Sequence, residues 1–374
     1  MSRHLTLHVR LLKGCQADCS YCSSWTLDGG RRMSPDEYAR ALRFVVDVLL
    51  PGFGCAGPAS TVSVQYVGGE ILLVPPSELR ACVEIGREIL GTAFGEVIDG
   101  AQSNLVASER RVLGLDALFG GRLGTSVDGR GTQRTVRGSA DAYRAAVARS
   151  REALLRRRRR RPGAIFVVDR QGLGNVEYEI EAASQGGYQL ILRPVFSGGR
   201  AVNEASVLEL VDVLGRAFDA WAMRSRVPVE PFMLLLTRRI GLANATSQGS
   251  VCPFQRNCAA VSLDIEPDGT LFTCLDMADS SQFPLGNALR GTFDWDLWRQ
   301  LRSRTDTIDP RCASCPFFMA CQGGCMSEAI HHTGSPYGRS DLCAVWTDLF
   351  HRIDALVERH GRQEVSAWAH SLVA

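Results

Sequence analysis

Three cysteines stand close together near the N-terminus, at Cys15, Cys19 and Cys22. They directly follow residues 5–12, an alternating apolar run that is typical of a β-strand. Thiolates select zinc, copper(I) or iron-sulfur clusters. Because three thiols complete neither a four-thiolate zinc site nor a closed cluster, the loop predicts a metal centre with one open coordination position. A zinc loop or plain structural thiols are the alternative.

A second, denser set of cysteines occupies the last third of the chain. Eight thiols make two four-thiolate sites, and metal-ligand energy can replace a large apolar core in such a module. Zinc is again the alternative, because CxxC pairs also suit zinc knuckles. Cys55 and Cys82 are left over as ordinary thiols. The eight thiols of the two predicted sites are Cys252, Cys258, Cys274, Cys312, Cys315, Cys321, Cys325 and Cys343.

Composition limits the class of protein. A chain of 374 residues that is 45% hydrophobic can form one large domain and a smaller one. Thirteen cysteines without a secretory leader favour metal binding in a reducing cytoplasm over disulfides. No apolar run is long enough to span a membrane. A net charge of +2 gives no general attraction to nucleic acid or an anionic membrane.

Strands and helices alternate through the first 225 residues, which predicts an α/β fold with a parallel sheet and right-handed crossovers. Six units are fewer than a closed eightfold barrel needs, so we expect a partial (β/α)6 TIM-like barrel with its chemistry at the C-terminal strand ends. The expected strands are 5–12, 61–67, 96–103, 122–127, 164–168 and 188–195. The expected helices are 35–50, 77–90, 107–119, 139–157, 175–185 and 204–225.

The pattern changes near residue 228, where short strands and the dense cysteines begin. We therefore expect three parts: a barrel over 1–230, a small cysteine-rich domain with two four-thiolate metal sites over 231–345, and a C-terminal helix over 346–374.

The CxxxCxxC spacing, with Tyr21 before the third cysteine, resembles the signature of radical S-adenosylmethionine (SAM) enzymes. The resemblance implies that Cys15, Cys19 and Cys22 hold three irons of a 4Fe-4S cluster. The fourth iron would bind SAM, and Tyr21 would lie near the adenine.

Three strand-end motifs extend this resemblance. Gly68-Gly69-Glu70 is similar to the family's GGEP element, although Ile71 replaces the proline. Residues 102–104 resemble its QTN element and residues 126–129 its SLDG element. The resemblance implies that SAM is contacted by Gly68, Gly69, Glu70, Asn104 and Ser126; structural turns are the competing interpretation for the last two motifs.

The later cysteines, together with Gly269, resemble the SPASM extension of radical SAM enzymes. In that family the ligands of the two auxiliary clusters interleave. The resemblance implies one 4Fe-4S cluster on Cys252, Cys258, Cys274 and Cys325 and another on Cys312, Cys315, Cys321 and Cys343, so that the chain would hold three clusters.

Among SPASM enzymes, the order and spacing are most similar to anaerobic sulfatase-maturating enzymes and to maturases of ribosomally made peptides. The implied reaction takes an electron from a donor such as flavodoxin or ferredoxin. It cleaves SAM reductively to a 5'-deoxyadenosyl radical, which abstracts a substrate hydrogen so that a peptide side chain is oxidised or crosslinked. Asp276 is the candidate base, but it stands one residue later than the family's aspartate because Leu275 follows Cys274. A surface or hydrogen-bonding role is its alternative.

Other functions stay open on the sequence. One is a maturase that makes formylglycine in a sulfatase, and another is a radical SAM dehydrogenase of a small carbohydrate or cyclitol. A non-enzymatic zinc or electron-transfer scaffold would cleave no SAM. Because no leader-binding domain precedes residue 5, we expect the peptide to bind at the barrel mouth, on the SPASM face or through a separate leader-peptide-binding protein. Trp25 is either a substrate contact or core.

Residues 156–161 are six consecutive arginines at the end of a predicted helix. Cations are favoured near a helix C-terminus, so a solvated helix end explains them. Docking of an acidic peptide or protein partner is the alternative.

Overall fold

The N-terminal strand lies inside one eleven-stranded sheet. β1 (His4–Arg10) pairs in parallel with β3 (Gly57–Val67) on one side and with β10 (Ser262–Ile265) on the other. Its residues alternate between the two faces, as in any strand. Leu5, Leu7 and Val9 are fully buried in the main apolar core, whereas Arg10 lines a cavity. The computed structural model describes residues 4–22, 30–127, 134–195, 204–242, 254 and 258–373.

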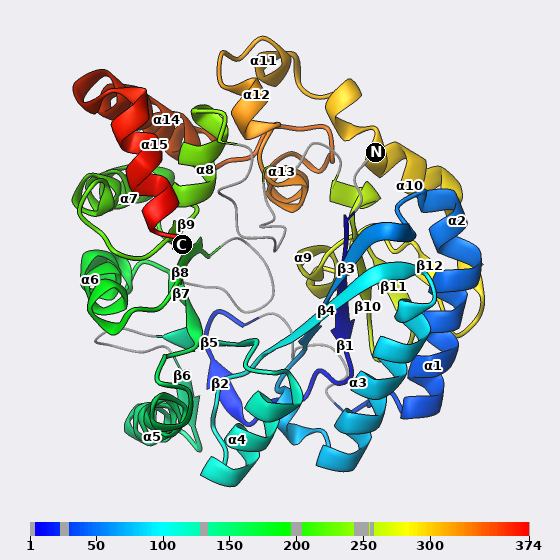
Figure 1. The fold of residues 1–374 in the computed structure, drawn as a ribbon. Helices are drawn as coiled ribbons and strands as arrows, with labels where there is room; N and C mark the ends of the chain where they lie inside the picture. The colour runs from blue at the N-terminus through cyan, green and yellow to red at the C-terminus, as the bar shows by residue number, and fades with distance from the viewer. Residues whose placement is uncertain are drawn as a thin grey trace.

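The parallel part of the sheet runs from β10 through β1 and β3 to β9, and it confirms the predicted partial barrel. The strands lie inside and the helices lie outside them (Figure 1). The further strands of this part are β4 (Phe94–Gln102), β5 (Leu123–Val127), β7 (Gly163–Val168), β8 (Leu190–Pro194) and β9 (Val229–Glu230).

A helix follows each of the six predicted strands. The first begins at Ser34, whose side chain forms a reciprocal capping box with Glu37. It is continued by a π-helical turn, Val45–Leu49, and a short helix. The helices are α1 (Pro35–Phe44), α2 (Leu50–Phe53), α3 (Pro76–Gly91), α4 (Glu109–Leu118), α5 (Ala140–Arg158), α6 (Val176–Gly186), α7 (Val207–Trp221) and α8 (Phe232–Arg239).

The C-terminal part extends the sheet on the β1 side and then forms short helices. Its antiparallel strands are β11 (Thr270–Phe272), β12 (Gly286–Asn287) and β13 (Thr292–Phe293). A second closing helix, which the sequence analysis missed, begins after Gly361, whose φ is 81°. The helices are α9 (Leu275–Asp279), α10 (Trp295–Arg302), α11 (Pro310–Ala313), α12 (Phe318–Cys321), α13 (Met326–Thr333), α14 (Cys343–His360) and α15 (Arg362–Ser371).

Apolar packing joins the N-terminal and C-terminal parts. Leu263 of β10 belongs to the same core as Leu5. In a second core, Trp221 of α7 contacts Trp368 of α15, with ring centroids 4.7 Å apart. The domain limits at 230 and 345 stay a prediction, because side chains from both sides of residue 230 are buried together.

In the described part of the chain, none of the helices combines the length and apolar character needed to cross a membrane.

Glu230, at the end of β9, offers a test of the packing through pH. It is 3% exposed, and its carboxylate accepts a hydrogen bond from the Leu234 amide at 3.0 Å. Burial raises its pKa from 4.5 to about 7. Because the folded-state pKa lies above the unfolded one, this group's stabilising contribution is complete below the unfolded pKa and is lost as the pH rises through about 7.

We expect Glu230→Gln to flatten the dependence of unfolding free energy on pH by up to about 3 kcal/mol between about pH 4.5 and pH 7. Urea denaturation across that range measures it. Glu88→Gln, on an exposed position of α3, is the matched control and should keep the wild-type slope. An unchanged slope in Glu230→Gln would show that the carboxyl is solvated.

Candidate functional site

The carboxyl ends of the parallel strands surround a cavity of about 270 Å³. This is the end of a barrel at which catalytic residues gather. Every residue that the sequence assigned to the first cluster, to SAM or to the base lies here. They are Cys15, Cys19, Tyr21, Cys22, Gly68, Gly69, Glu70, Asn104, Ser126 and Asp276. Their roles stay predictions, but five separate segments bring them to one place.

A two-stranded ribbon anchors the cysteine loop. β2 (Ala17–Cys19) pairs antiparallel with β6 (Arg134–Val136), which places Cys19 opposite Arg134. The guanidinium of Arg134 lies 5.4 Å from the ring centroid of Tyr21 and also lines the cavity. Ala17 packs against Tyr143 of α5 beside Cys15 and Cys19. The loop is therefore held by the chain that leads into α5.

The Cys15 sulfur is set up to accept hydrogen bonds. The Ala17 amide donates to Sγ at 3.3 Å and the Asn104 side-chain amide at 3.5 Å. Burial raises the pKa of the free Cys15 thiol to about 11, and Glu70 and Cys22 add to the rise. A metal must therefore displace the thiol proton when it binds. Two N–H groups directed at the sulfur suit a thiolate, and such bonds tune iron-sulfur clusters.

The glycine pair allows two backbones to cross. The Gly69 amide donates to the Leu12 carbonyl at 3.2 Å, and the Glu70 amide donates to the Gly14 carbonyl at 2.9 Å. A Cβ on Gly69 would lie 2.1 Å from the Lys13 carbonyl oxygen. No side chain fits there. The crossing thus fixes the end of β3 against the cysteine loop. This structural requirement explains the two glycines without any contact to SAM.

Glu70 fixes the end of β4 in the same way. Its side chain is 1% exposed, and it accepts hydrogen bonds from the Leu72 amide at 2.9 Å, the Ser103 hydroxyl at 2.7 Å and the Asn104 amide at 2.7 Å. Burial raises its pKa, and these three bonds oppose the rise. A carboxylate can accept about four hydrogen bonds. One acceptor position is left for a ligand, as an ammonium group would require.

Charged residues form the opposite wall, and of these the sequence analysis identified only Asp276. Asp276 lies in the first turn of α9 and pairs with Arg193 from β8. Arg10 pairs with Glu266 at 3.2 Å and with Asp279. Of these charged residues, the cavity is lined by Arg10, Asp279, Arg193 and Asp276. The helical conformation, rather than an extended one, turns Asp276 toward the site. Polar residues alternating with apolar ones in β1 were the available signal for Arg10.

These cations affect their buried neighbours. Burial lowers the pKa of His8 to about 4, with Arg10 and Arg193 adding to the effect, so His8 is neutral near pH 7. Burial raises the pKa of Glu328 on α13 to about 7, where Asp276 adds to the rise and Arg193 opposes it. Glu328 is therefore a carboxyl group near this wall that could exchange a proton at neutral pH.

A separate cavity of about 150 Å³ gathers four cysteines of the C-terminal part. Burial raises the pKa of Cys321 to about 12, and the neighbouring Cys343 and Cys312 thiols contribute. Four converging thiols beside a cavity fit a thiolate-bound cluster. They are Cys312, Cys315, Cys321 and Cys343, the set that the resemblance assigns to the second auxiliary cluster.

The other auxiliary set is only partly described. Cys258 and Cys274 pack against the core that contains β1, and Cys325 directly precedes α13. Cys252 and Trp25 lie outside the described residues, as do residues 128 and 129. Among the described residues, no three His, Cys, Asp or Glu side chains converge as one metal ion would require. A four-iron cluster instead takes each thiolate on a different iron.

The fold is shared with radical SAM/SPASM proteins. The structure of anSMEcpe, an anaerobic sulfatase-maturating enzyme, with bound AdoMet matches with a TM-score of 0.75 and 18% identity, covering 99% of this chain and 98% of that one. Native anSMEcpe with bound AdoMet and Kp18Cys peptide matches with a TM-score of 0.74 and 17% identity, covering 95% of this chain and 99% of that one. Streptococcus suis SuiB bound to precursor peptide SuiA matches with a TM-score of 0.58 and 17% identity, covering 92% of this chain and 76% of that one.

At these identities the likeness establishes the fold alone: a partial barrel like that of the radical SAM neighbours, with a cysteine-rich C-terminal part. No protein-family model matches the sequence, and no curated protein does either.

The backbone crossing at Gly69 makes a prediction. Gly69→Ala should push the loop at residues 12–14 away from the end of β3, because the added Cβ meets backbone atoms. Overpacking of this kind costs about 1–3 kcal/mol. We expect SAM affinity of the reconstituted protein, measured by equilibrium dialysis, to fall about tenfold.

Gly91→Ala at the end of α3 is the control, because its Cβ would meet nothing within 4 Å. It should leave SAM affinity unchanged. Equal affinities for the two variants would contradict a positioning role for the crossing.

Proposed function

We propose that this protein is a radical SAM enzyme that modifies a side chain of a peptide or protein. The observation that carries the proposal is the single cavity at the strand ends. It brings three cysteines, the glycine pair and Glu70 to one side and the Arg193–Asp276 ion pair to the other. A cofactor site thus faces a charged wall across a space large enough for a side chain.

The chain's residues would divide the work between the two walls. Cys15, Cys19 and Cys22 would hold a 4Fe-4S cluster, with Glu70 and Ser126 contacting SAM. When bound, the cluster and SAM supply a carbon radical that removes a hydrogen atom from the substrate. Gln102 donates to the Ser126 hydroxyl at 3.4 Å and so orients it inside the cavity.

The charged wall would receive the substrate. Arg193 holds the Asp276 carboxylate at the cavity surface. We infer that Asp276 takes the proton released when the substrate carbon is oxidised. Hydrogen abstraction followed by loss of a second electron and a proton removes two hydrogens in total. The auxiliary clusters, one of them on the four thiols around the second cavity, would accept that electron.

A peptide substrate agrees with the relatives of this fold. anSMEcpe has been solved with Kp18Cys peptide and SuiB with precursor peptide SuiA. We extend peptide modification to this chain as a proposal. An electron donor such as flavodoxin or ferredoxin and a separate leader-binding protein belong to the same proposal.

The test is anaerobic reconstitution with SAM, a reductant and the product of a neighbouring small open reading frame. Mass spectrometry should show a peptide that has lost two hydrogens, together with 5'-deoxyadenosine. Cys19→Ala should abolish both products. Cys82→Ala, a buried thiol on α3 outside all three sets, should retain both.

Cys315→Ala and Cys274→Ala should lower peptide modification at least tenfold while SAM cleavage continues. Normal peptide product from Cys274→Ala would remove the auxiliary clusters from the mechanism. SAM cleavage coupled to oxidation of a sugar or cyclitol, with no change in peptide mass, would replace the peptide proposal.

A further inference from the structure

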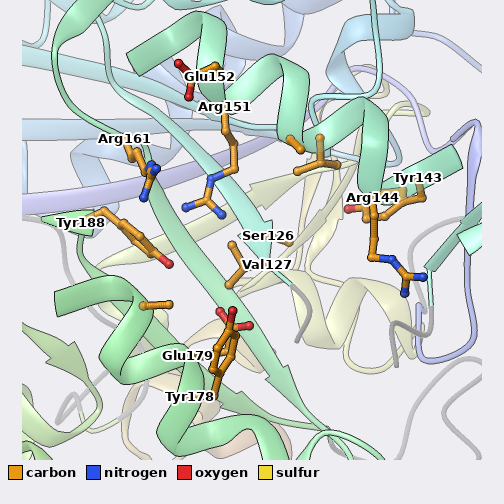
Figure 2. Close-up of a pocket in the computed structure, with 13 residues that line it drawn as sticks. Ser126, Val127, Tyr143, Arg144, Arg151, Glu152, Arg161, Tyr178, Glu179 and Tyr188 are labelled. Carbon is orange, nitrogen blue, oxygen red and sulfur yellow. The ribbon is translucent and has the colours of Figure 1, made fainter. Parts of the chain in front are cut away.

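A larger cavity, of about 720 Å³, lies on the helix side of the sheet between α5 and α6. Figure 2 shows β5 ending between the two helices, with side chains from both directed into the space. The volume falls within the range of small-ligand pockets. None of the residues assigned to clusters lines it, and Ser126 is its one SAM-site residue. Its function therefore needs a separate explanation.

Arg151 is the feature that indicates a ligand. Its Nε and Nη2 atoms are buried, yet neither has a hydrogen-bond partner. In Figure 2 its guanidinium points from α5 into the middle of the cavity. The guanidinium carbon lies over the ring of Tyr188, 4.8 Å from the ring centroid. A ring face attracts the cation but accepts none of its in-plane N–H groups. Buried donors normally have acceptors, so we expect a ligand atom to accept hydrogen bonds from Nε and Nη2 of Arg151.

Other side chains favour a negatively charged occupant. Arg161 also lines the cavity, close to Tyr188. Gly186 makes room for both, because a Cβ there would lie 2.8 Å from Arg161 Nη1 and 2.6 Å from Tyr188 Cε1. Arg144 at the rim pairs with Asp141 on its own helix. Two guanidinium groups thus remain for a ligand at one end.

Two acidic residues, Glu152 and Glu179, also line the cavity. Glu152 is exposed, whereas Glu179 is buried and lies beside Tyr178 on the α6 side (Figure 2). Elsewhere in the arginine run, Arg156 pairs with Glu109 and Arg158 with Asp116. These acidic partners neutralise part of the run, whereas Arg161, its last arginine, lines the cavity.

We propose that the cavity between α5 and α6 is a binding site for an oxyanion, a carboxylate or phosphate group held by Arg151 and Arg161. The planar guanidinium matches both groups with two parallel hydrogen bonds. Tyr143 and Tyr188 provide a largely apolar wall for the rest of the ligand. The same chemistry can come from an acidic side chain of a peptide or from a free small anion. The site does not depend on the reaction proposed at the strand ends.

The occupant would sit next to the reaction site. Ser126 of β5 lines both cavities, so that a single strand separates them. Tyr143 lines this cavity and also packs against Ala17 in the cysteine loop. An acidic peptide segment bound here would therefore be held close to the catalytic cavity.

Fluorescence anisotropy of the intact, cluster-loaded protein, without reductant or SAM, tests the proposal. The probes are fluorescein-labelled hexaglutamate and hexaglutamine, with inorganic phosphate as a competitor. We expect saturable binding of hexaglutamate only, weakened at least tenfold by Arg151→Gln. Arg149→Gln, an exposed arginine on the same helix, should bind within about twofold of wild type.

A second variant keeps the test decisive if Arg151→Gln lowers the melting temperature. Ala182→Glu places a carboxylate on the α6 wall without removing any contact of Arg151, and it should block the same binding. Displacement by phosphate alone, with the same variant dependence, would assign the site to a free anion. Equal binding by wild type and Arg151→Gln, or equal losses in Arg151→Gln and Arg149→Gln, would overturn the proposal.

Discussion

The candidate site depends on the backbone crossing between residues 12–14 and Gly69-Glu70. Two amide hydrogen bonds and the absence of a Cβ hold the end of β3 directly against the cysteine loop. Glu70 then carries the constraint to β4, since its carboxylate binds the Ser103 hydroxyl and the Asn104 amide. Asn104 in turn donates to Cys15. The thiols and the strand ends therefore form one rigid unit rather than a flexible loop over a barrel.

Buried charge joins this unit to the C-terminal part. Lys13, beside the crossing, pairs with Glu266, which also binds Arg10. Removing one member of such a network would leave an uncompensated buried charge, which is costly. The cysteine-rich part is thereby fixed on the β10 side of the barrel, and it supplies Asp276 to the cavity opposite the cysteine loop.

Much of this arrangement could be predicted from the sequence because its signals are local. Strand-helix alternation predicted the six units, and the motifs at the strand ends converge because parallel strands end at one edge. The pairing of β1 with β10 could not be predicted, since a four-residue buried strand has no periodicity that identifies its partner. The Arg193–Asp276 pair joins residues 83 positions apart, and the Arg151 cavity arises only when α5 and α6 pack.

Metal analysis of the anaerobically purified protein tests directly whether the chain holds three 4Fe-4S clusters. We expect about twelve irons and matching acid-labile sulfide per chain in the wild type. Replacing Cys15, Cys19 and Cys22 together by alanine should lower the iron content to about eight, because only the SAM-binding cluster is lost. Zinc with little iron, or an iron content that the triple variant leaves unchanged, would contradict it.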